Sequence, residues 1–230
     1  MTTATRYKRL RSRLDDACKV AGRKPEDVLL LAVSKTVDLD QVEVAISAGV
    51  HSFGENRPDE LLRKKQAFPE ENWHFIGNIQ SRRIHDIVSA ADLIHSVTKV
   101  EHLKRIDSAA ADCDKIQRIL LEVNVSGEES KSGFTPQEVY DALVASTSFE
   151  NIEVCGLMTM APRADEEAVL STFTGLRDLR DELQNRLVAQ GFQILLSELS
   201  MGMTEDWEAA VPLGTTIVRV GRAIFDDTFE

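Results

Sequence analysis

Short apolar runs alternate with amphipathic helical segments along the whole of this 230-residue chain. The first run, Val28–Lys35, is apolar or small up to its final lysine. A continuous run of this kind, bounded by turn signals, is typical of a strand buried on both faces in a parallel sheet. Seven further runs repeat the pattern: Val50–Asn56, Asn72–Asn78, Asp92–Val97, Arg118–Val125, Ile152–Met160, Ile194–Ser200 and Thr216–Gly221.

A helical segment follows each of these runs, and one more precedes the first. The predicted helices are Tyr7–Ala21, Leu39–Ala48, Pro58–Phe68, Ser81–Ala91, Lys99–Cys113, Thr135–Ser146, Glu166–Ala189, Thr204–Val211 and Arg222–Phe225, with 201–203 as the exit loop of the seventh strand. Eight βα units in this length predict a single (β/α)8 barrel domain over residues 1–230, with an extra helix in front. An open doubly wound sheet is the alternative, and it is disfavoured because no G-x-G-x-x-G follows the first strand.

The composition excludes several classes of partner. A net charge of -11 argues against a nucleic-acid surface, which needs clustered lysine and arginine. Three widely spaced cysteines, Cys18, Cys113 and Cys155, indicate a reducing compartment and no zinc site or other metal site. No apolar run approaches the ~18 residues of a membrane span, and the first residues lack a signal-peptide core. We therefore expect a cytoplasmic protein with no membrane or nucleic-acid partner.

In a barrel of this type the functional site forms at the carboxyl ends of the strands. The predicted strand ends carry one amine, Lys35, among neutral groups such as Asn56 and Asn124. Glu55 is the only strong carboxylate candidate, whereas hydrolytic acid–base pairs and magnesium sites need two or three acids. The sequence therefore disfavours both of those chemistries.

Lys35 is the candidate nucleophile. Burial of its stem at a strand end disfavours the ammonium form, and a neutral amine forms Schiff bases with carbonyl compounds. The alternative is a strand-end lysine that extends into water.

Glycines follow two neighbouring strands, as a phosphate-binding site requires. Ser200-Met201-Gly202 and Val220-Gly221-Arg222 each allow a backbone to approach a phosphate, and barrels often bind phosphate after strands seven and eight. Together with Lys35, this pairing predicts a phosphorylated carbonyl ligand, either pyridoxal phosphate or a sugar phosphate. Arg219 shares a strand face with Gly221, so it either donates to a pyridine nitrogen or forms a salt bridge inside the barrel.

Two other side-chain types on the strands favour structural roles. Trp73 and His74 alternate on the third strand, and a hydrogen-bonded structural histidine is more common than a catalytic base. The four methionines Met158, Met160, Met201 and Met203 are expected to form the walls of the pocket.

Several segments, taken in order, resemble one known family. They are Leu31–Lys35, Phe53–Asn56, Trp73–Gln80, Ser126–Gly133, Gly156–Met160, Leu199–Met203 and Val218–Phe225. Together they resemble the pyridoxal phosphate homeostasis protein family (YggS/PROSC type), which is related to the barrel domain of alanine racemase, the fold type III group of pyridoxal enzymes. The resemblance departs at Thr204, where serine is frequent, and at Asp226-Asp227, where a glycine often stands.

The resemblance implies that Lys35 holds pyridoxal 5'-phosphate as an internal aldimine and that Asn56 lines the site. It also implies phosphate contacts from Ser200 and from the backbone of Gly221 and Arg222, with Arg219 near the pyridine nitrogen. Family members are understood as carriers or buffers of the cofactor within vitamin B6 homeostasis, without established turnover. The implied partners are the cofactor itself and PLP-dependent apo-enzymes as candidate recipients, and the expected state is a monomer.

The sequence also helps to distinguish an enzyme from a carrier of the cofactor. In alanine racemases a tyrosine from a carboxyl-terminal domain supplies the second proton-transfer group, whereas the only tyrosines here, Tyr7 and Tyr140, fall on predicted helices. We therefore expect a non-catalytic protein. Three alternatives remain: a fold type III amino-acid racemase or decarboxylase completed by a partner, a Schiff-base aldolase for a sugar phosphate, and a protein-binding barrel with an empty mouth.

Overall fold

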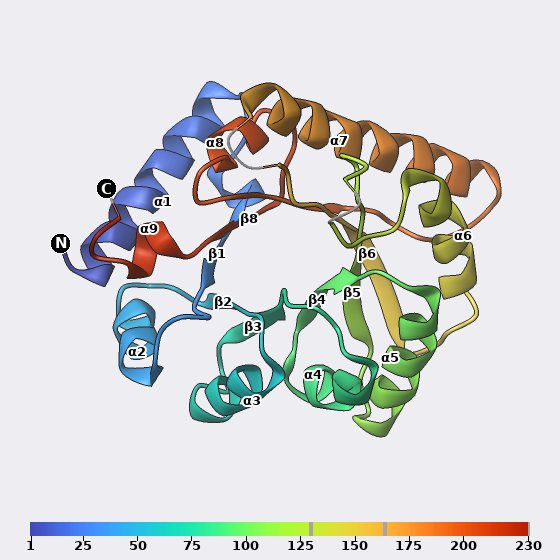
Figure 1. Ribbon diagram of the computed structural model, residues 1–230, viewed down its shortest axis with the longest axis horizontal. Helices are drawn as coiled ribbons and strands as arrows, with labels where there is room; N and C mark the ends of the chain where they lie inside the picture. Colours follow the sequence, from blue (N-terminus) through green and yellow to red (C-terminus); the bar gives the residue numbers. More distant parts are fainter. Residues whose placement is uncertain (129–130, 163–164, 230) are drawn as a thin grey trace.

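Eight parallel strands form a closed barrel in the computed structural model, which describes residues 1–128, 131–162 and 165–229. Each strand pairs with the next along the chain, and β1 closes the ring against β8. In Figure 1 the strands surround the centre and the helices lie outside them. The strands are β1 (Leu29–Val33), β2 (Ser52–Glu55), β3 (Asn72–Phe75), β4 (Leu93–Val97), β5 (Gln117–Glu122), β6 (Ile152–Met158), β7 (Glu198–Met203) and β8 (Ile217–Val220). The predicted (β/α)8 barrel is confirmed.

The helices follow the predicted order. They are α1 (Thr3–Val20), α2 (Leu39–Ser47), α3 (Pro58–Ala67), α4 (Ile84–Ala90), α5 (Val100–Asp112), α6 (Pro136–Ser146), α7 (Glu166–Ala189), α8 (Trp207–Ala210) and α9 (Arg222–Phe225), with 3-10 turns η1 (Pro25–Asp27) and η2 (Ser81–Arg83). The extra helix in front is α1, as predicted. It packs beside α9, because the buried Nε of Arg6 donates to the backbone oxygen of Ile224 at 2.8 Å and ties the two ends of the chain together. Among the residues that the structure describes, no helix is both long enough and apolar enough to cross a membrane.

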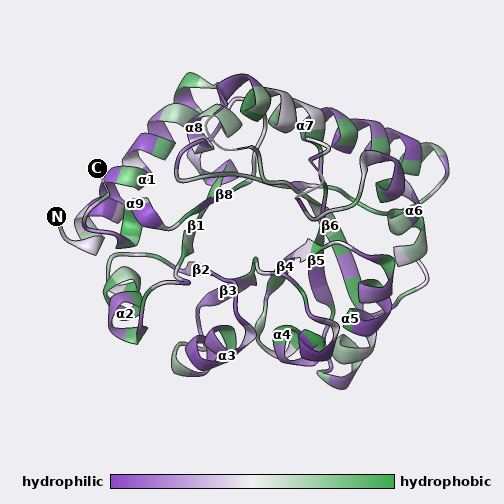
Figure 2. Ribbon diagram, in the orientation of Figure 1, coloured by the Kyte–Doolittle hydropathy of each residue, from purple (hydrophilic) through white to green (hydrophobic). Residues whose placement is uncertain are grey.

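Most of the core lies between the strands and the outer helices. Alternate strand residues point outward, and Phe53 of β2 stacks on Trp73 of β3 with ring centroids 5.0 Å apart. The helices carry both hydrophilic and hydrophobic bands in Figure 2, as expected where one face covers the barrel. A smaller apolar cluster fills the barrel interior: Leu31, Leu93, Leu120, Cys155, Met158 and Ile217.

The seventh strand differs from its prediction. We expected Ile194–Ser200 with an exit loop at 201–203, but β7 begins at Glu198 and continues to Met203. The side chain of Gln184 on α7 bonds both the backbone oxygen of Ile194 and the backbone N–H of Leu196, so this apolar segment satisfies its polar groups without strand pairing. β7 then pairs with β8 through a register shift that places Met203 beside Arg219.

Candidate functional site

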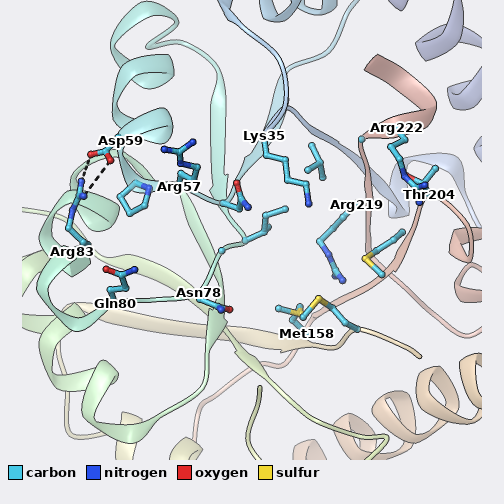
Figure 3. Close-up of a pocket in the computed structure, with 18 of the residues that line it drawn as sticks. Lys35, Arg57, Asp59, Asn78, Gln80, Arg83, Met158, Thr204, Arg219 and Arg222 are labelled. Atoms are coloured by element: carbon cyan, nitrogen blue, oxygen red, sulfur yellow. Dashed lines mark hydrogen bonds and ion pairs between the residues drawn. The ribbon is translucent and has the colours of Figure 1, made fainter. Parts of the chain in front are cut away.

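A cavity of about 670 Å³ opens at the carboxyl ends of the strands. Its lining comes from the ends of β1, β2, β3, β6, β7 and β8, as the barrel topology predicts for a functional site. Figure 3 shows Lys35, Arg219 and Met158 around one part of this space, with Thr204 and Arg222 beside them. The residues around Arg57, Asp59 and Gln80 lie at the other part.

Lys35 follows the last residues of β1 and points into the cavity (Figure 3). The backbone before it is fixed, because the buried Ser34 donates its hydroxyl to Glu55 Oε1 at 2.6 Å. Lys35 itself is exposed. The strand end opens directly onto the cavity, so the amine is accessible to a ligand there.

Arg219 projects from β8 into the barrel beneath the cavity and is only 5% exposed. Its guanidinium donates to the hydroxyl of Ser200 at 2.7 Å and to the backbone oxygen of Thr159 at 2.9 Å. Burial lowers the pKa of Arg219 to about 10, and the carboxylates of Asp206 and Glu122 act in the opposite direction. The guanidinium is therefore a fixed cation at neutral pH.

Ser200 lies below the cavity and is absent from its lining. Its hydroxyl is fully buried and contacts Arg219 on one side and His95 Nδ1, at 2.9 Å, on the other. The resemblance implies a phosphate contact at Ser200, and this geometry does not offer one. The register shift in β7 accounts for the difference, because it brings Met203 and Thr204 to the cavity wall and leaves Ser200 inside the barrel.

Gly221 and Arg222 line the same part of the cavity as Thr204. A Cβ at Gly221 would lie 3.0 Å from the backbone oxygen of Val33, so only glycine leaves this contact between β8 and β1 undisturbed. Arg222 forms an ion pair with Glu205 at the rim. These residues combine a hydroxyl, a backbone free of side chain and a guanidinium, which are the groups that bind phosphate.

Asn56 also lines the cavity, between the end of β2 and the N-cap residue Arg57 of α3, and β2 flanks β1 on the side away from β8. Arg83 and Asp59 line the cavity as well and form an ion pair at 2.5 Å, drawn with dashed lines in Figure 3. Met158, Met160 and Met203 also line the cavity, as predicted. The fourth methionine, Met201, is instead fully buried in the outer core, because the alternation along β7 turns it outward.

Glu55 does not reach the cavity. It is fully buried between β2 and α3, where its Oε1 accepts from Lys64 Nζ at 2.6 Å. Lys64 also donates to the backbone oxygen of Ser34 at 2.8 Å, so the pair supports the strand end that carries Lys35. The expectation of a carboxylate in the barrel mouth at Glu55 is wrong, because period-two alternation turns this side chain toward the helices.

Two interior residues were missed by sequence analysis. His95 on β4 lies two positions after the interior Leu93, and its pKa is lowered by burial and by the neighbouring His74 and Arg219. Glu122 on β5 lies two positions after the interior Leu120, and burial raises the pKa of its carboxyl while Arg219 lowers it. Counting by twos along each strand from an interior leucine was the signal that would have found both.

His74 was placed correctly on an alternating strand, and it lies inside the barrel rather than among the helices. Its Nδ1 lies 2.9 Å from His95 Nε2. Burial lowers the pKa of His74 to about 4, against a smaller opposing effect of Asp92. Both imidazoles are therefore neutral at neutral pH.

The family model described as "Alanine racemase, N-terminal domain" matches residues 6–228. The chain is 36% identical over 230 residues to a pyridoxal phosphate homeostasis protein of Aquifex aeolicus, covering 99% of both chains. It is 37% identical to the protein of that description from Pseudomonas aeruginosa, covering 97% of this chain and 95% of the other.

Solved structures show the same similarity. PipY of Synechococcus elongatus with PLP bound superposes with a TM-score of 0.84 at 30% identity, covering 97% of this chain and all of PipY. An alanine racemase of Clostridium difficile superposes with a TM-score of 0.71 at 17% identity, covering 96% of this chain and 58% of the racemase, which shows a shared fold. The loop Ser126–Gly133, one of the segments noted in the sequence, lies partly outside the described residues.

Proposed function

The chain belongs to the pyridoxal phosphate homeostasis protein family, within the alanine racemase N-terminal domain group, and from this premise we propose that it binds pyridoxal 5'-phosphate in the barrel mouth and serves vitamin B6 homeostasis. One observation supports this most directly. A single cavity brings together an exposed amine at Lys35, a buried cation at Arg219 and a phosphate-binding edge at Gly221. These groups match the aldehyde, ring nitrogen and phosphate of the cofactor.

Each of these residues has a distinct role in the proposal. Lys35 holds the cofactor covalently through a Schiff base with its aldehyde. Gly221, Arg222 and Thr204 bind the phosphate, and Thr204 takes the role that the resemblance gives to Ser200. Asn56, at the end of the strand next to β1, also contacts the ligand.

Arg219 sets the electronic state of the bound ring. A guanidinium only donates hydrogen bonds, so a ring nitrogen facing it accepts one and stays unprotonated. When bound to a protein, pyridoxal phosphate supplies an electrophilic carbon and a conjugated ring. The ring is a weak electron sink when its nitrogen is unprotonated. This arrangement supports storage of the cofactor more than chemistry on it.

The position of the tyrosines also supports a carrier. Racemisation needs a second proton-transfer group facing the lysine. Tyr7 is on α1 and Tyr140 on α6, where its hydroxyl bonds Gln190, and neither lines the cavity. We propose that this chain does not turn over amino acids. The second candidate is an amino-acid racemase or decarboxylase whose active site is completed by a partner subunit. A tyrosine or cysteine that another subunit supplies to the cavity would be evidence for it.

The absorption spectrum of the purified protein tests this proposal. We expect a visible band from the lysine-bound aldehyde after incubation with pyridoxal 5'-phosphate, and its loss in Lys35→Ala. Lys104→Ala is the control, because Lys104 is an exposed residue on the surface of α5. A wild-type protein that stays colourless would refute the proposal.

Borohydride reduction followed by mass analysis of the Lys35 peptide identifies the ligand. A pyridoxyl-phosphate adduct is expected, whereas a sugar-phosphate adduct would support a Schiff-base aldolase. Incubation of the loaded protein with L-alanine should leave the amino acid optically unchanged. Racemisation at an ordinary enzymatic rate would favour the second candidate.

We also propose that the loaded protein acts as a monomer and passes its cofactor to apo-enzymes in the cytoplasm. Light scattering of the loaded protein should give a mass near 25.6 kDa. Activation of a PLP-dependent apo-enzyme should be faster with the loaded protein than with the same concentration of cofactor released from it. Equal rates would show that the enzyme takes up only free cofactor.

A further inference from the structure

A column of buried polar side chains crosses the barrel interior beneath the cavity. It runs from Arg219 on β8 to Ser200 on β7 at 2.7 Å, from Ser200 to His95 on β4 at 2.9 Å, and from His95 to His74 on β3 at 2.9 Å. All four side chains are at least nine-tenths buried. His74 also lines a cavity at the opposite, amino-terminal end of the strands, so the column spans most of the barrel.

The interior of a barrel of this fold is ordinarily filled by branched apolar side chains. Part of this interior follows that rule, with Leu31, Leu93 and Leu120 packed together. Polar side chains at the remaining positions cost stability unless each one is hydrogen-bonded. The column meets this condition, and its upper end is the guanidinium assigned to the cofactor ring.

The donors and acceptors fix the direction of the column. Arg219 can only donate, so the hydroxyl of Ser200 accepts from it and directs its own hydrogen elsewhere. Within the described part of the chain, His95 Nδ1 is the only other partner of that hydroxyl. Nδ1 of His95 therefore accepts, and this imidazole carries its hydrogen on Nε2. That hydrogen is donated to His74 Nδ1, which leaves His74 protonated on Nε2 as well.

The reverse direction leaves a buried donor without a partner. If His95 donated from Nδ1, the hydroxyl of Ser200 would accept two hydrogen bonds and its hydrogen would have no acceptor. An unsatisfied buried donor costs more than a hydrogen bond contributes.

Burial keeps both imidazoles neutral, as the column requires. His95 faces His74 and Arg219, and both disfavour a second proton on it. His74 faces Asp92, which favours a proton, and Arg118, which disfavours it, with burial dominating. A protonated His95 would lose its acceptor at Nδ1 and repel the guanidinium.

We propose that Ser200, His95 and His74 are positioning residues that hold the guanidinium of Arg219 in place against the ring nitrogen of the ligand. The bonds to Ser200 and to the backbone oxygen of Thr159 use two of the five N–H donors of Arg219, and the others remain available toward the cavity. This inference rests on the proposed function for its ligand. The direction of the column is a property of the ligand-free chain.

Histidine nitrogen NMR of the ligand-free wild-type protein tests the direction. We expect both His74 and His95 to be neutral at pH 7 and to carry their hydrogen on Nε2. A hydrogen on Nδ1 of His95, or a charged imidazole at either position, would overturn the proposed column. This measurement uses neither a variant nor the cofactor, so its result does not depend on the proposed function.

Variants at His95 test the positioning role. His95→Gln keeps an acceptor and a donor in the same side chain, whereas His95→Leu removes both. We expect His95→Leu and Ser200→Ala to bind pyridoxal 5'-phosphate about tenfold more weakly, the effect of one lost hydrogen bond to a charged group. Their visible bands should also shift. His95→Gln should bind within about threefold of wild type, and His85→Leu, a change at an exposed histidine on α4, should be unaltered.

The outcomes separate the two proposals. Wild-type affinity and an unshifted band in both His95→Leu and Ser200→Ala would refute the positioning role. If His95→Leu does not fold, Ser200→Ala and the ligand-free NMR measurement decide the question. A wild-type protein without a visible band would refute the proposed function, and the NMR result would still establish or reject the direction of the column.

Discussion

At the scale of single residues, the buried ion pair between Lys64 and Glu55 supports the site from behind. Both side chains are fully buried, and Glu55 Oε1 accepts from Lys64 at 2.6 Å and from Ser34 at 2.6 Å. The second carboxylate oxygen, Oε2, has no hydrogen-bond partner among the described residues. The pair is therefore only partly satisfied, and removing one member leaves a buried charge.

Lys64→Met is expected to lower the free energy of unfolding by about 3–5 kcal/mol, because Glu55 remains buried without its cation. The double variant Lys64→Met/Glu55→Leu should recover a large part of this loss. Equilibrium urea unfolding measures both. Lys104→Met on the surface of α5 is the control, with an expected change of at most about 0.5 kcal/mol. A loss in Lys64→Met no larger than in the control would show that the pair contributes little.

At the scale of elements, the contact between β6 and β7 depends on the absence of a side chain. Gly156 pairs with Glu198, and a Cβ at position 156 would lie 1.9 Å from the backbone oxygen of Glu198. No side-chain rotation relieves a clash with backbone. This contact helps to fix the register of β7 against β6, and β7 carries Ser200 and Met203.

Gly156→Ala is expected to destabilise the protein by at least about 1–3 kcal/mol, the range found for overpacking, because the two strands must separate. Gly175→Ala on α7 is the matched control, since its Cβ would meet only the end of the Val125 side chain at 2.8 Å and alanine favours helix. Thermal unfolding compares them. Equal melting temperatures for the two variants would contradict the close β6–β7 contact.

At the scale of the whole molecule, two neutral imidazoles inside the barrel make stability depend on pH. The pKa of His74 is lowered from an ordinary value of 6.5 to about 4 by burial, and the pKa of His95 is lowered by burial and by the neighbouring His74 and Arg219. At a pH between the lowered pKa of each histidine in the folded chain and its ordinary value, the unfolded chain binds a proton that the folded chain does not. The free energy of unfolding therefore falls as the pH falls. Glu122, whose pKa is raised by burial, acts in the opposite direction.

The contribution of His74 is measured by comparing wild type with His74→Gln from pH 7 to pH 4. Wild type should lose about 3 kcal/mol more than the variant as pH falls through this range, and nothing of this difference should appear above pH 7. Urea unfolding at each pH gives the two curves, and His85→Gln, at an exposed histidine, should parallel wild type. Parallel curves for His74→Gln and wild type would mean that His74 is not neutral in the folded protein.

Much of the barrel was predictable because its signals are local. The run Val28–Lys35 and the helix Leu39–Ala48 were recognised from apolar spacing, which depends only on neighbouring residues. The seventh strand was misplaced because Ile194 and Leu196 are apolar enough for a strand, yet Gln184, ten or more residues away, satisfies their backbone. The presence of Lys35, Arg219 and Gly221 around one cavity was likewise expected from the rule that barrel sites lie at strand ends.

The sequence by itself determined the number and order of the elements and brought Lys35, Arg219 and Gly221 to the barrel mouth. Only the tertiary structure decided that Glu55 faces Lys64 instead of the cavity, and that Ser200 joins His95 and Arg219 across the barrel. The reason is physical. Periodicity is a property of adjacent residues, whereas strand register and the pairing of buried polar groups depend on side chains far apart in sequence that meet only when the ring of strands closes.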